Sequence, residues 1–288
     1  MNQLNIFIQI TRLKKPIGYM LLFWPCAWGL SLAYDFKQSL NDYFFFLTLF
    51  FLGSVLMRSA GCIVNDILDR KFDEKVFRTK DRPIASGKIS VKLGLFYASI
   101  LCLVAFLVLI NFNFFTIIIA LASMPLAFTY PLMKRLTYWP QLFLGITFNY
   151  GLILGWTSIN TEINLLPLIF YFGAIFWTLG YDTIYGFQDI KDDEIIGLKS
   201  TSIKFKSNPI VFLYICYTVL LSSLIMIGYL NEFNNLYFIF LVIIIYQMYI
   251  FQIKNFNSSE PLSCYKIFKS NNILGVLIFV SLLIGKLN

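Results

Sequence analysis

The stretch "DYFFFLTLFFLGSVLMRSAGCIVNDILDRKFD", residues 42–73, joins a long apolar run to a dense cluster of charge. The run up to Val64 is long enough to cross the hydrocarbon core of a bilayer, which takes about 20 apolar residues in a helix. From Asn65 to Asp73, five of nine residues carry charge, although only 13% of the whole chain is charged and 58% is hydrophobic. The pattern indicates a membrane-spanning helix whose end presents carboxylates and cations to a polar compartment.

The rest of the chain repeats the apolar part of this pattern. Its mean hydropathy is +0.73, which is too apolar for the surface of a soluble protein of 288 residues. Runs of about 18 or more mostly apolar residues are typical of transmembrane helices. We therefore expect an all-α polytopic membrane protein, a single domain over residues 1–288, with nine helices around a central cavity: 17–34, 42–64, 91–110, 112–131, 138–158, 165–184, 209–229, 235–253 and 270–287.

The basic residues are distributed unevenly between the two sides of such a protein. Most of the 23 Lys and Arg residues fall on the side that holds the N-terminus, whereas Lys37 and Lys286 fall on the other side and Arg58 lies within a span. Basic loops are retained on the cytoplasmic side, so we expect the N-terminus there. The net charge of +8 then reflects topology and an anionic substrate, and it does not indicate a nucleic-acid partner.

The residue types that are missing exclude several kinds of chemistry. The chain contains no His, which excludes haem ligation by His, His-ligated metal sites and His-based triads. Its five Cys residues form no CxxC pair, so the sequence indicates neither a disulfide framework nor a zinc site.

Acidic residues gather in two segments on the side of the N-terminus, residues 65–87 and 181–201, each directly after an apolar span. Four spans separate the two segments, which suggests an internal duplication. An Asp at the centre of a span costs about 2.5–3.5 kcal/mol. We therefore expect both segments at the mouth of a water-accessible cavity.

The carboxylates within these segments recur at helical spacing. Residues four apart share one face of a helix, and Asp66 lies off the first face that this spacing defines. Carboxylate and amide oxygens without imidazole or thiolate suit Mg²⁺. Two oxygen-bearing faces follow: Asn65, Asp69 and Asp73 on one, and Asp182, Asp189 and Asp193 on the other.

Carboxylates at helix ends often only cap the helix or pair with Lys and Arg, but the recurrence in two segments favours a metal site. Nearby cations extend the prediction to a diphosphate site, because Mg²⁺ in proteins is commonly shared with substrate phosphates and because Arg and Lys bind phosphate oxygens. The cations closest in sequence to the two faces are Arg78, Arg82 and Lys199.

At this point the residues resemble a known family. "NDILDRKFD" followed by "RTKDRPIASG", together with the later "DTIYGFQDIKDDEIIGLKST", are similar to the two Asp-rich motifs of the UbiA superfamily of intramembrane prenyltransferases. Within the superfamily, "RLKKPIGYMLLFWPCAWGL" and "YPLMKRLTYWPQLFLG" resemble the 4-hydroxybenzoate polyprenyltransferases of ubiquinone biosynthesis. The resemblance covers most of the chain.

The resemblance implies a role for each motif residue. Arg135 would bind the carboxylate of the aromatic acceptor, with Arg12 as a second candidate, and Asp66 would orient the phenol or accept a proton. In the second motif Lys191 stands where some relatives carry Asp, which leaves open which of Asp189, Asp192 and Asp193 bind metal. The implied catalytic residues are Asp66, Asp69 and Asp182; the implied metal ligands are the six oxygen-bearing residues; the implied diphosphate ligands are Arg78, Arg82 and Lys199.

The resemblance also implies the reaction. A polyprenyl group would pass from polyprenyl diphosphate to the ring of 4-hydroxybenzoate, ortho to its hydroxyl, with Mg²⁺ as cofactor. Tyr130, Tyr181 and Tyr185 would shelter an allylic cation, although interfacial anchoring or core packing explains each of them equally well. The alternatives are transfer to another aromatic acceptor, as in the menaquinone or haem O branches, and a secondary transporter, whose charges should lie nearer the bilayer midplane.

Location and partners complete these expectations. We expect the bacterial cytoplasmic (inner) membrane, with the N-terminus and both Asp-rich segments cytoplasmic, and an association with other quinone-biosynthesis enzymes. The length of the prenyl donor, the proton acceptor and the oligomeric state do not follow from the sequence.

Overall fold

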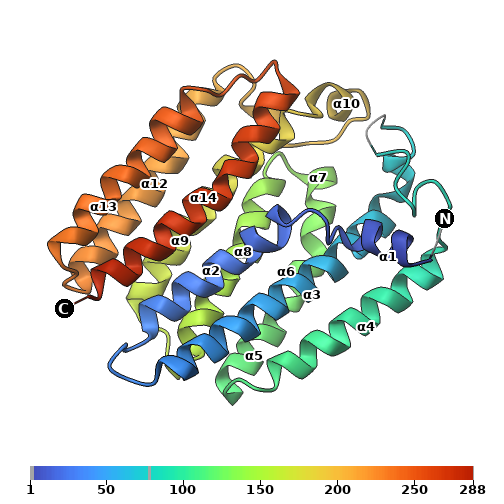
Figure 1. The fold of residues 1–288 in the computed structure, drawn as a ribbon. Coiled ribbons are helices and arrows are strands. Elements are labelled where there is room, and N and C mark those ends of the chain that lie inside the picture. Colours follow the sequence, from blue (N-terminus) through green and yellow to red (C-terminus); the bar gives the residue numbers. More distant parts are fainter. Residues whose placement is uncertain (1–2, 77–78, 288) are drawn as a thin grey trace.

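A computed structural model describes residues 3–76 and 79–287, and every regular element within these ranges is a helix (Figure 1). This confirms the all-α prediction. The elements are α1 (Gln3–Thr11), α2 (Ile17–Ala33), α3 (Leu40–Asp73), α4 (Val91–Leu109), α5 (Phe114–Ala122), α6 (Met124–Thr129), the 3₁₀ helix η1 (Tyr130–Leu132), α7 (Met133–Leu136), α8 (Pro140–Thr157), α9 (Leu165–Gly186), α10 (Ile190–Ile195), α11 (Thr201–Lys204), α12 (Pro209–Leu230), α13 (Asn235–Ile245), the π-helix η2 (Tyr246–Ile253) and α14 (Pro261–Gly285).

Each of the nine expected apolar segments is helical, but the expected count of nine spans is not reproduced in every detail. Seven helical segments within the described ranges are long and apolar enough to cross a membrane, and α2 and α8 are not among them. The 17 residues of α2 form a shorter apolar helix. The single-domain boundaries and the internal duplication remain predictions.

Two expected spans contain a local change of helix type. The segment 112–131 divides into α5 and α6 at Ser123, two residues before Pro125. Proline has no N–H to donate and its ring clashes with the preceding turn, so a helix is interrupted there. The segment 235–253 remains continuous but changes from α13 into the π-helix η2.

Helix α2 packs closely against α8, and it also contacts α3 and α14. Two glycines make the approach to α8 possible. A Cβ atom at Gly29 would lie 2.0 Å from the carbonyl oxygen of Leu152, and one at Gly155 would lie 2.2 Å from that of Cys26. Small residues at such contacts let helix backbones pack closely in membranes, where no hydrophobic effect drives helices together.

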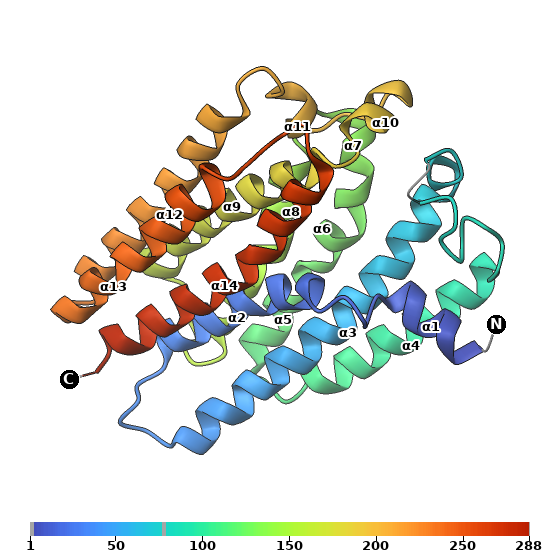
Figure 2. The same cartoon turned by 45° about the horizontal axis from the view of Figure 1, so that its top comes forward.

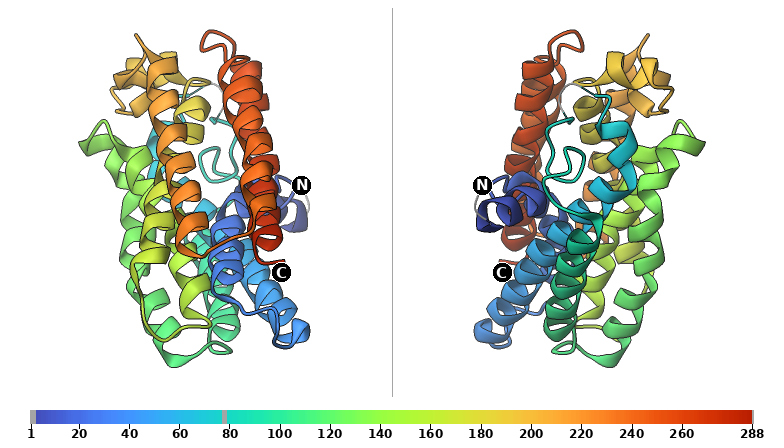
Figure 3. Two further views of the ribbon diagram at one scale, coloured as in Figure 1. Left: turned by 90° about the vertical axis from the view of Figure 1, so that its left-hand side faces the viewer. Right: turned by 90° about the vertical axis from the view of Figure 1, so that its right-hand side faces the viewer.

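The segments that follow α3 and α9 lie at the same end of the bundle, away from the α2–α3 connection and the end of α14 (Figures 1 and 2). Helix α1 lies beside α3 and α4 (Figure 3). A small apolar cluster joins α1 to α3, to the segment after α3 and to α4, through Ile6, Ile10, Ile63, Ile84, Ile89 and Ala98. The chain after α1 turns at Arg12, whose φ of 55° is uncommon for a residue with a Cβ.

Candidate active site

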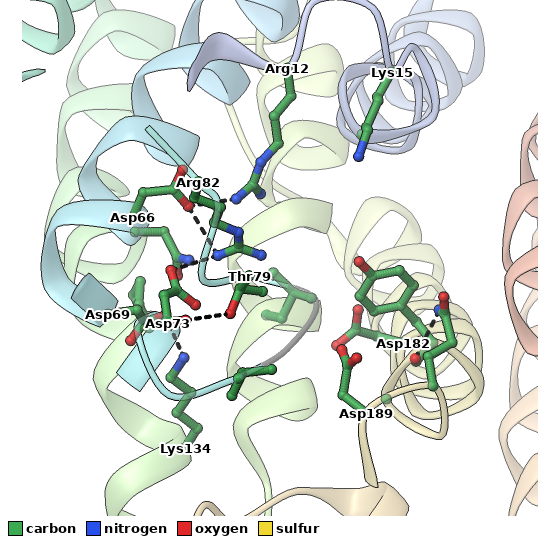
Figure 4. Close-up of a pocket in the computed structure, with 18 of the residues that line it drawn as sticks. Arg12, Lys15, Asp66, Asp69, Asp73, Thr79, Arg82, Lys134, Asp182 and Asp189 are labelled. Carbon is green, nitrogen blue, oxygen red and sulfur yellow. Dashed lines mark hydrogen bonds and ion pairs between the residues drawn. The ribbon is translucent and has the colours of Figure 1, made fainter. Parts of the chain in front are cut away.

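A cavity of about 1240 Å³ lies at the end of the bundle where the two charged segments meet (Figure 4). Helices α1, α3, α8 and α9 contribute to its wall, and so do the segments after α3 and α9. The prediction that the two segments belong to one site therefore agrees with the geometry. Five of the six predicted metal ligands are carboxylates that line this cavity together with Asn65.

The first wall of the cavity is the end of α3. Asp66, Asp69 and Asp73 are 2%, 1% and 7% exposed, and all three line the cavity with Asn65. The expectation that Asp66 lies off this face is wrong. Each residue turns an α-helix by about 100°, so Asp66 is only about 20° from Asp73 around the axis.

Asp66 is held by two guanidinium groups. Its Oδ1 accepts hydrogen bonds from Nη2 of Arg12 at 2.5 Å and from Nη1 of Arg82 at 3.1 Å. The same Nη1 of Arg82 also donates to Oδ2 of Asp73 at 2.8 Å. Arg12 therefore lies beside the α3 carboxylates. Asp66 is thus paired with two cations, and its expected role at the phenol remains a prediction.

Asp69 is paired with α7, which follows η1. Lys134 donates a hydrogen bond from Nζ to Oδ2 of Asp69, and Nη2 of Arg135 lies 3.5 Å from Oδ1. Lys134 lines the cavity, but Arg135 does not. Arg135 donates to the carbonyl oxygen of Leu68 at 2.7 Å, and its guanidinium lies 4.8 Å from the centre of the Phe72 ring. The structure therefore does not bring Arg135 to the place expected for it.

The opposite wall is formed by the end of α9 and the segment after it. Asp182, Asp189 and Asp193 all line the cavity, whereas Asp192 does not. Figure 4 shows Asp182 and Asp189 near each other and across the cavity from the α3 carboxylates. Lys199 also lines the cavity, and its Nζ donates to the carbonyl oxygen of Leu136 at 3.2 Å.

The donor set of the two walls fits Mg²⁺ in its chemistry. Within residues 3–76 and 79–287, no three acidic, His or Cys side chains are arranged closely enough to enclose one metal ion. Mg²⁺ does not need such an enclosure, because it is usually held by one or two carboxylates, by water and by substrate phosphates. Arg78, the third predicted diphosphate ligand, lies outside the described residues.

Arg58 is a cavity residue to which the sequence reasoning gave no role. It lies within α3, and its guanidinium is 5.3 Å from the centre of the Phe148 ring. A Cβ atom at Gly18 would lie 2.9 Å from its Nε, so the glycine leaves room for the side chain. Among the described residues it forms no ion pair or hydrogen bond. An ionisable residue inside an apolar span is itself a signal of function.

Several aromatic side chains line the same cavity as Arg58. Tyr130, Tyr181 and Tyr185 line the cavity together with Arg58, and the Tyr130 ring lies 6.4 Å from the Phe148 ring, centre to centre. The rings of Tyr185 and Phe268 are 4.5 Å apart, centre to centre. The three tyrosines named from the sequence thus share one wall, where their faces can stabilise a cation.

Comparison with known proteins agrees with the geometry of the site. The UbiA prenyltransferase family matches residues 22–282. The chain is 41% identical to the mitochondrial 4-hydroxybenzoate polyprenyltransferase of Bos taurus and 39% identical to that of Homo sapiens, and each comparison covers 99% of this chain and 76% of the relative. It is 38% identical to 4-hydroxybenzoate geranyltransferase 2 of Lithospermum erythrorhizon, over 98% of this chain and 90% of the relative.

Two solved structures share the fold. A UbiA homologue from Aeropyrum pernix K1, without ligand, superimposes with a TM-score of 0.77 at 20% identity, over 94% of this chain and 99% of that one. A homologue from Archaeoglobus fulgidus bound to DMAPP and Mg²⁺ gives a TM-score of 0.67 at 17% identity, over 96% of this chain and 97% of that one.

The relatives contradict the expected bacterial cytoplasmic membrane, because those from cattle and human are mitochondrial enzymes. Basic loops indicate which ends of a chain share one side of a membrane, but they do not identify the membrane. The part of the expectation that stands is a multi-pass membrane protein. From the family match, the full-length relatives and the shared fold, we conclude that this chain belongs to the UbiA prenyltransferase family.

Proposed function

We propose that this protein transfers a polyprenyl group from polyprenyl diphosphate to the ring carbon of 4-hydroxybenzoate that is ortho to the hydroxyl, with Mg²⁺ as cofactor. One observation carries the proposal most directly: a single cavity joins two carboxylate walls and their cations to Arg58 and the tyrosines. The names of the relatives, and the diphosphate and Mg²⁺ bound by the homologue from Archaeoglobus fulgidus, support the same reaction.

Arg12, Arg82 and Lys134 are proposed diphosphate ligands, and their position in the cavity beside the α3 carboxylates supports this role. Asn65, Asp69 and Asp73 on one wall, and Asp182, Asp189 and Asp193 on the other, are the proposed Mg²⁺ ligands. When bound, Mg²⁺ supplies positive charge that stabilises the departing diphosphate. Lys199 and Arg78 remain proposed diphosphate ligands.

The transfer begins with cleavage of the allylic C–O bond, whose electron pair leaves with the diphosphate. The aromatic wall of Tyr130, Tyr181 and Tyr185 then faces the allylic cation. The ring carbon ortho to the phenol oxygen forms the new C–C bond, and the loss of its proton restores aromaticity. A polyprenyl tail is insoluble in water, so reaction within the bilayer suits the donor.

Arg58 is the proposed partner of the acceptor carboxylate. It is a cation of the cavity without an ion pair among the described residues, whereas Arg135 is already bound to Asp69 and to the Leu68 carbonyl. Arg58 lies seven residues before Asn65 on α3, which places it about 10 Å deeper along the helix axis. An association with other quinone-biosynthesis enzymes remains a prediction.

The test is transfer by membranes that contain the protein. They are incubated with ring-labelled 4-hydroxybenzoate, a polyprenyl diphosphate and Mg²⁺, and lipid-soluble label is extracted. We expect label in the lipid fraction, none after chelation of Mg²⁺, and none with the folded Asp69→Asn or Asp182→Asn protein. Absence of lipid-soluble label with the wild-type protein would refute the proposal.

A further inference from the structure

A chain of three buried polar side chains leads from α8 to the cavity. Nδ2 of Asn149 lies 2.7 Å from Oγ1 of Thr178, and Oγ1 of Thr178 lies 3.2 Å from the hydroxyl of Tyr181. Asn149 and Thr178 are fully buried and Tyr181 is 1% exposed. Tyr181 also lines the cavity, whereas the other two residues lie behind it.

The direction of each hydrogen bond in this chain can be assigned. The atom of Asn149 that approaches Thr178 also lies 2.8 Å from the carbonyl oxygen of Gly145, which can only accept. This atom is therefore the amide nitrogen, and it donates to both partners. Thr178 accepts from Asn149, so its single hydroxyl proton goes to Tyr181. Tyr181 must then accept at its oxygen and direct its own proton elsewhere.

Nothing in the described part of the protein receives the Tyr181 proton. Thr178 is the only hydrogen-bond partner recorded there for its hydroxyl. Buried hydroxyl donors normally have an acceptor, and the open side of Tyr181 is the cavity. The orientation of the chain leaves Oδ1 of Asn149 buried without a partner. An unpartnered buried oxygen is unfavourable, and the structure tolerates it while keeping the hydrogen bonds directed from Asn149 through Thr178 to Tyr181.

Arg58 identifies the acceptor that suits this proton. It lines the same cavity as Tyr181, Tyr130 and Tyr185, so an anionic group held by the guanidinium would lie in the space that the Tyr181 hydroxyl faces. Hydrogen bonds to a charged acceptor are about twice as strong as those to a neutral one. A carboxylate has several lone pairs and can accept from Arg58 and from a hydroxyl at once.

We propose that Tyr181 is a specificity-determining residue that donates its hydroxyl proton to the carboxylate of the aromatic acid, and that Asn149 and Thr178 hold it in the donor role. The inference rests on the proposed function for the identity of the acid. It adds to Arg58 a second, uncharged hydrogen-bond donor, Tyr181. It also adds a buried relay, Asn149 and Thr178, that directs the Tyr181 hydroxyl proton into the cavity.

The test measures binding and turnover separately in the full-length protein. Tyr181→Phe removes only the hydroxyl. We expect it to weaken binding of 4-hydroxybenzoate, measured by calorimetry, about tenfold or more, and to raise KM for the acid by the same factor, while KM for the prenyl diphosphate stays unchanged. Tyr171→Phe is the matched control. It removes another hydroxyl of α9, one that donates to the Ile146 carbonyl outside the cavity, and should change neither value.

The relay is tested with Thr178. Thr178→Val should weaken acid binding by a smaller factor, and Thr178→Ser, which keeps the hydroxyl, should retain wild-type binding. Because both residues act through one proton, Tyr181→Phe combined with Thr178→Val should be no weaker than Tyr181→Phe alone. Additive losses would show that Thr178 acts by packing only and would overturn the relay.

Two competitors identify the acceptor atom. Tyr181→Phe should weaken inhibition by 4-chlorobenzoate about tenfold and leave inhibition by 4-chlorophenol unchanged. The opposite result would place Tyr181 at the phenol oxygen and overturn the proposal, as would unchanged acid binding in an active protein. Weakened acid binding in a protein that transfers no prenyl group would instead refute the proposed function and leave the Tyr181 contact standing.

Discussion

Replacing Asp66 by Asn separates a positioning role for this carboxylate from a role as proton acceptor. Asp66 is 3% exposed at its side chain and pairs with Arg12 at 2.5 Å and Arg82 at 3.1 Å, whose side chains are 25% and 22% exposed. Asn keeps the shape and removes the charge. A hydrogen bond to a charged group contributes about 1.5–3 kcal/mol, and partial exposure of the guanidiniums reduces this through solvent screening.

We take about 2 kcal/mol for the loss of both pairs, which corresponds to roughly a 30-fold change in an equilibrium. Because the two guanidiniums are proposed ligands of the diphosphate, we expect KM for the prenyl diphosphate to rise by about this factor. The KM for 4-hydroxybenzoate should not change. Initial rates of label transfer into lipid, with each substrate varied in turn, give both values.

Glu74→Gln is the matched control, since it neutralises a carboxylate just beyond α3 that pairs with Arg70 at 3.3 Å on an exposed surface. It should leave both KM values unchanged. A fall in kcat with unchanged KM in Asp66→Asn would refute the positioning role of Asp66. That result would support the sequence-based expectation that Asp66 acts on the phenol or accepts the proton.

Three further outcomes are expected. Arg58→Leu should raise KM for 4-hydroxybenzoate roughly tenfold or more, and Arg135→Ala should leave it near wild type; the reverse pattern in the same assay would restore Arg135 as the carboxylate ligand. Burial lowers the pKa of Lys286 to about 8, below the usual value near 10.4. Between these pH values the unfolded chain therefore binds more protons, and thermal stability in detergent should rise from pH 8 to pH 10, less so in Lys286→Met; a falling wild-type profile contradicts this. Inorganic pyrophosphate should bind more tightly with Mg²⁺ than without it in calorimetry. Mg²⁺ would take the place of the guanidiniums at the α3 carboxylates, and pyrophosphate would take the place of the carboxylates at the guanidiniums. Equal affinities would argue against this exchange of partners.

Hydropathy was sufficient to locate the long helices, because each crosses an apolar phase and must be apolar over its length. The short elements α1, α10 and α11 were not predicted, since a helix of 4 to 9 residues at a polar surface leaves no apolar run of that length. The extension of α3 to Asp73 was implied by the spacing of its carboxylates. The close approach of α2 to α8 at Gly29 and Gly155 depends on residues far apart in the chain, and no local pattern reports it.

In the site, as in the fold, spacing along one helix could be read from the sequence, whereas contacts between distant residues could not. Spacing on one helix predicted that Asp69 and Asp73 share a face, and both line the cavity. Their partners come from elsewhere: Lys134 is 65 residues from Asp69 in the chain. Lys134 and Arg135 are consecutive in α7, so one turns to the cavity and the other turns onto Phe72. A helix of four residues has too little pattern to show which one faces inward.

The charges that line the cavity balance among the described residues, and this balance supports the proposal that the reaction uses added cations. Seven Lys or Arg side chains face seven Asp side chains: Arg12, Lys14, Lys15, Arg58, Arg82, Lys134 and Lys199 against Asp66, Asp69, Asp73, Asp81, Asp182, Asp189 and Asp193. Phosphate groups are largely ionised at neutral pH, so a diphosphate and an aromatic carboxylate together add about four negative charges. Two Mg²⁺ ions would restore neutrality. With both substrates bound, the α3 carboxylates would hold the metal and their guanidinium partners would hold the diphosphate, so that no charge would be left buried without a partner.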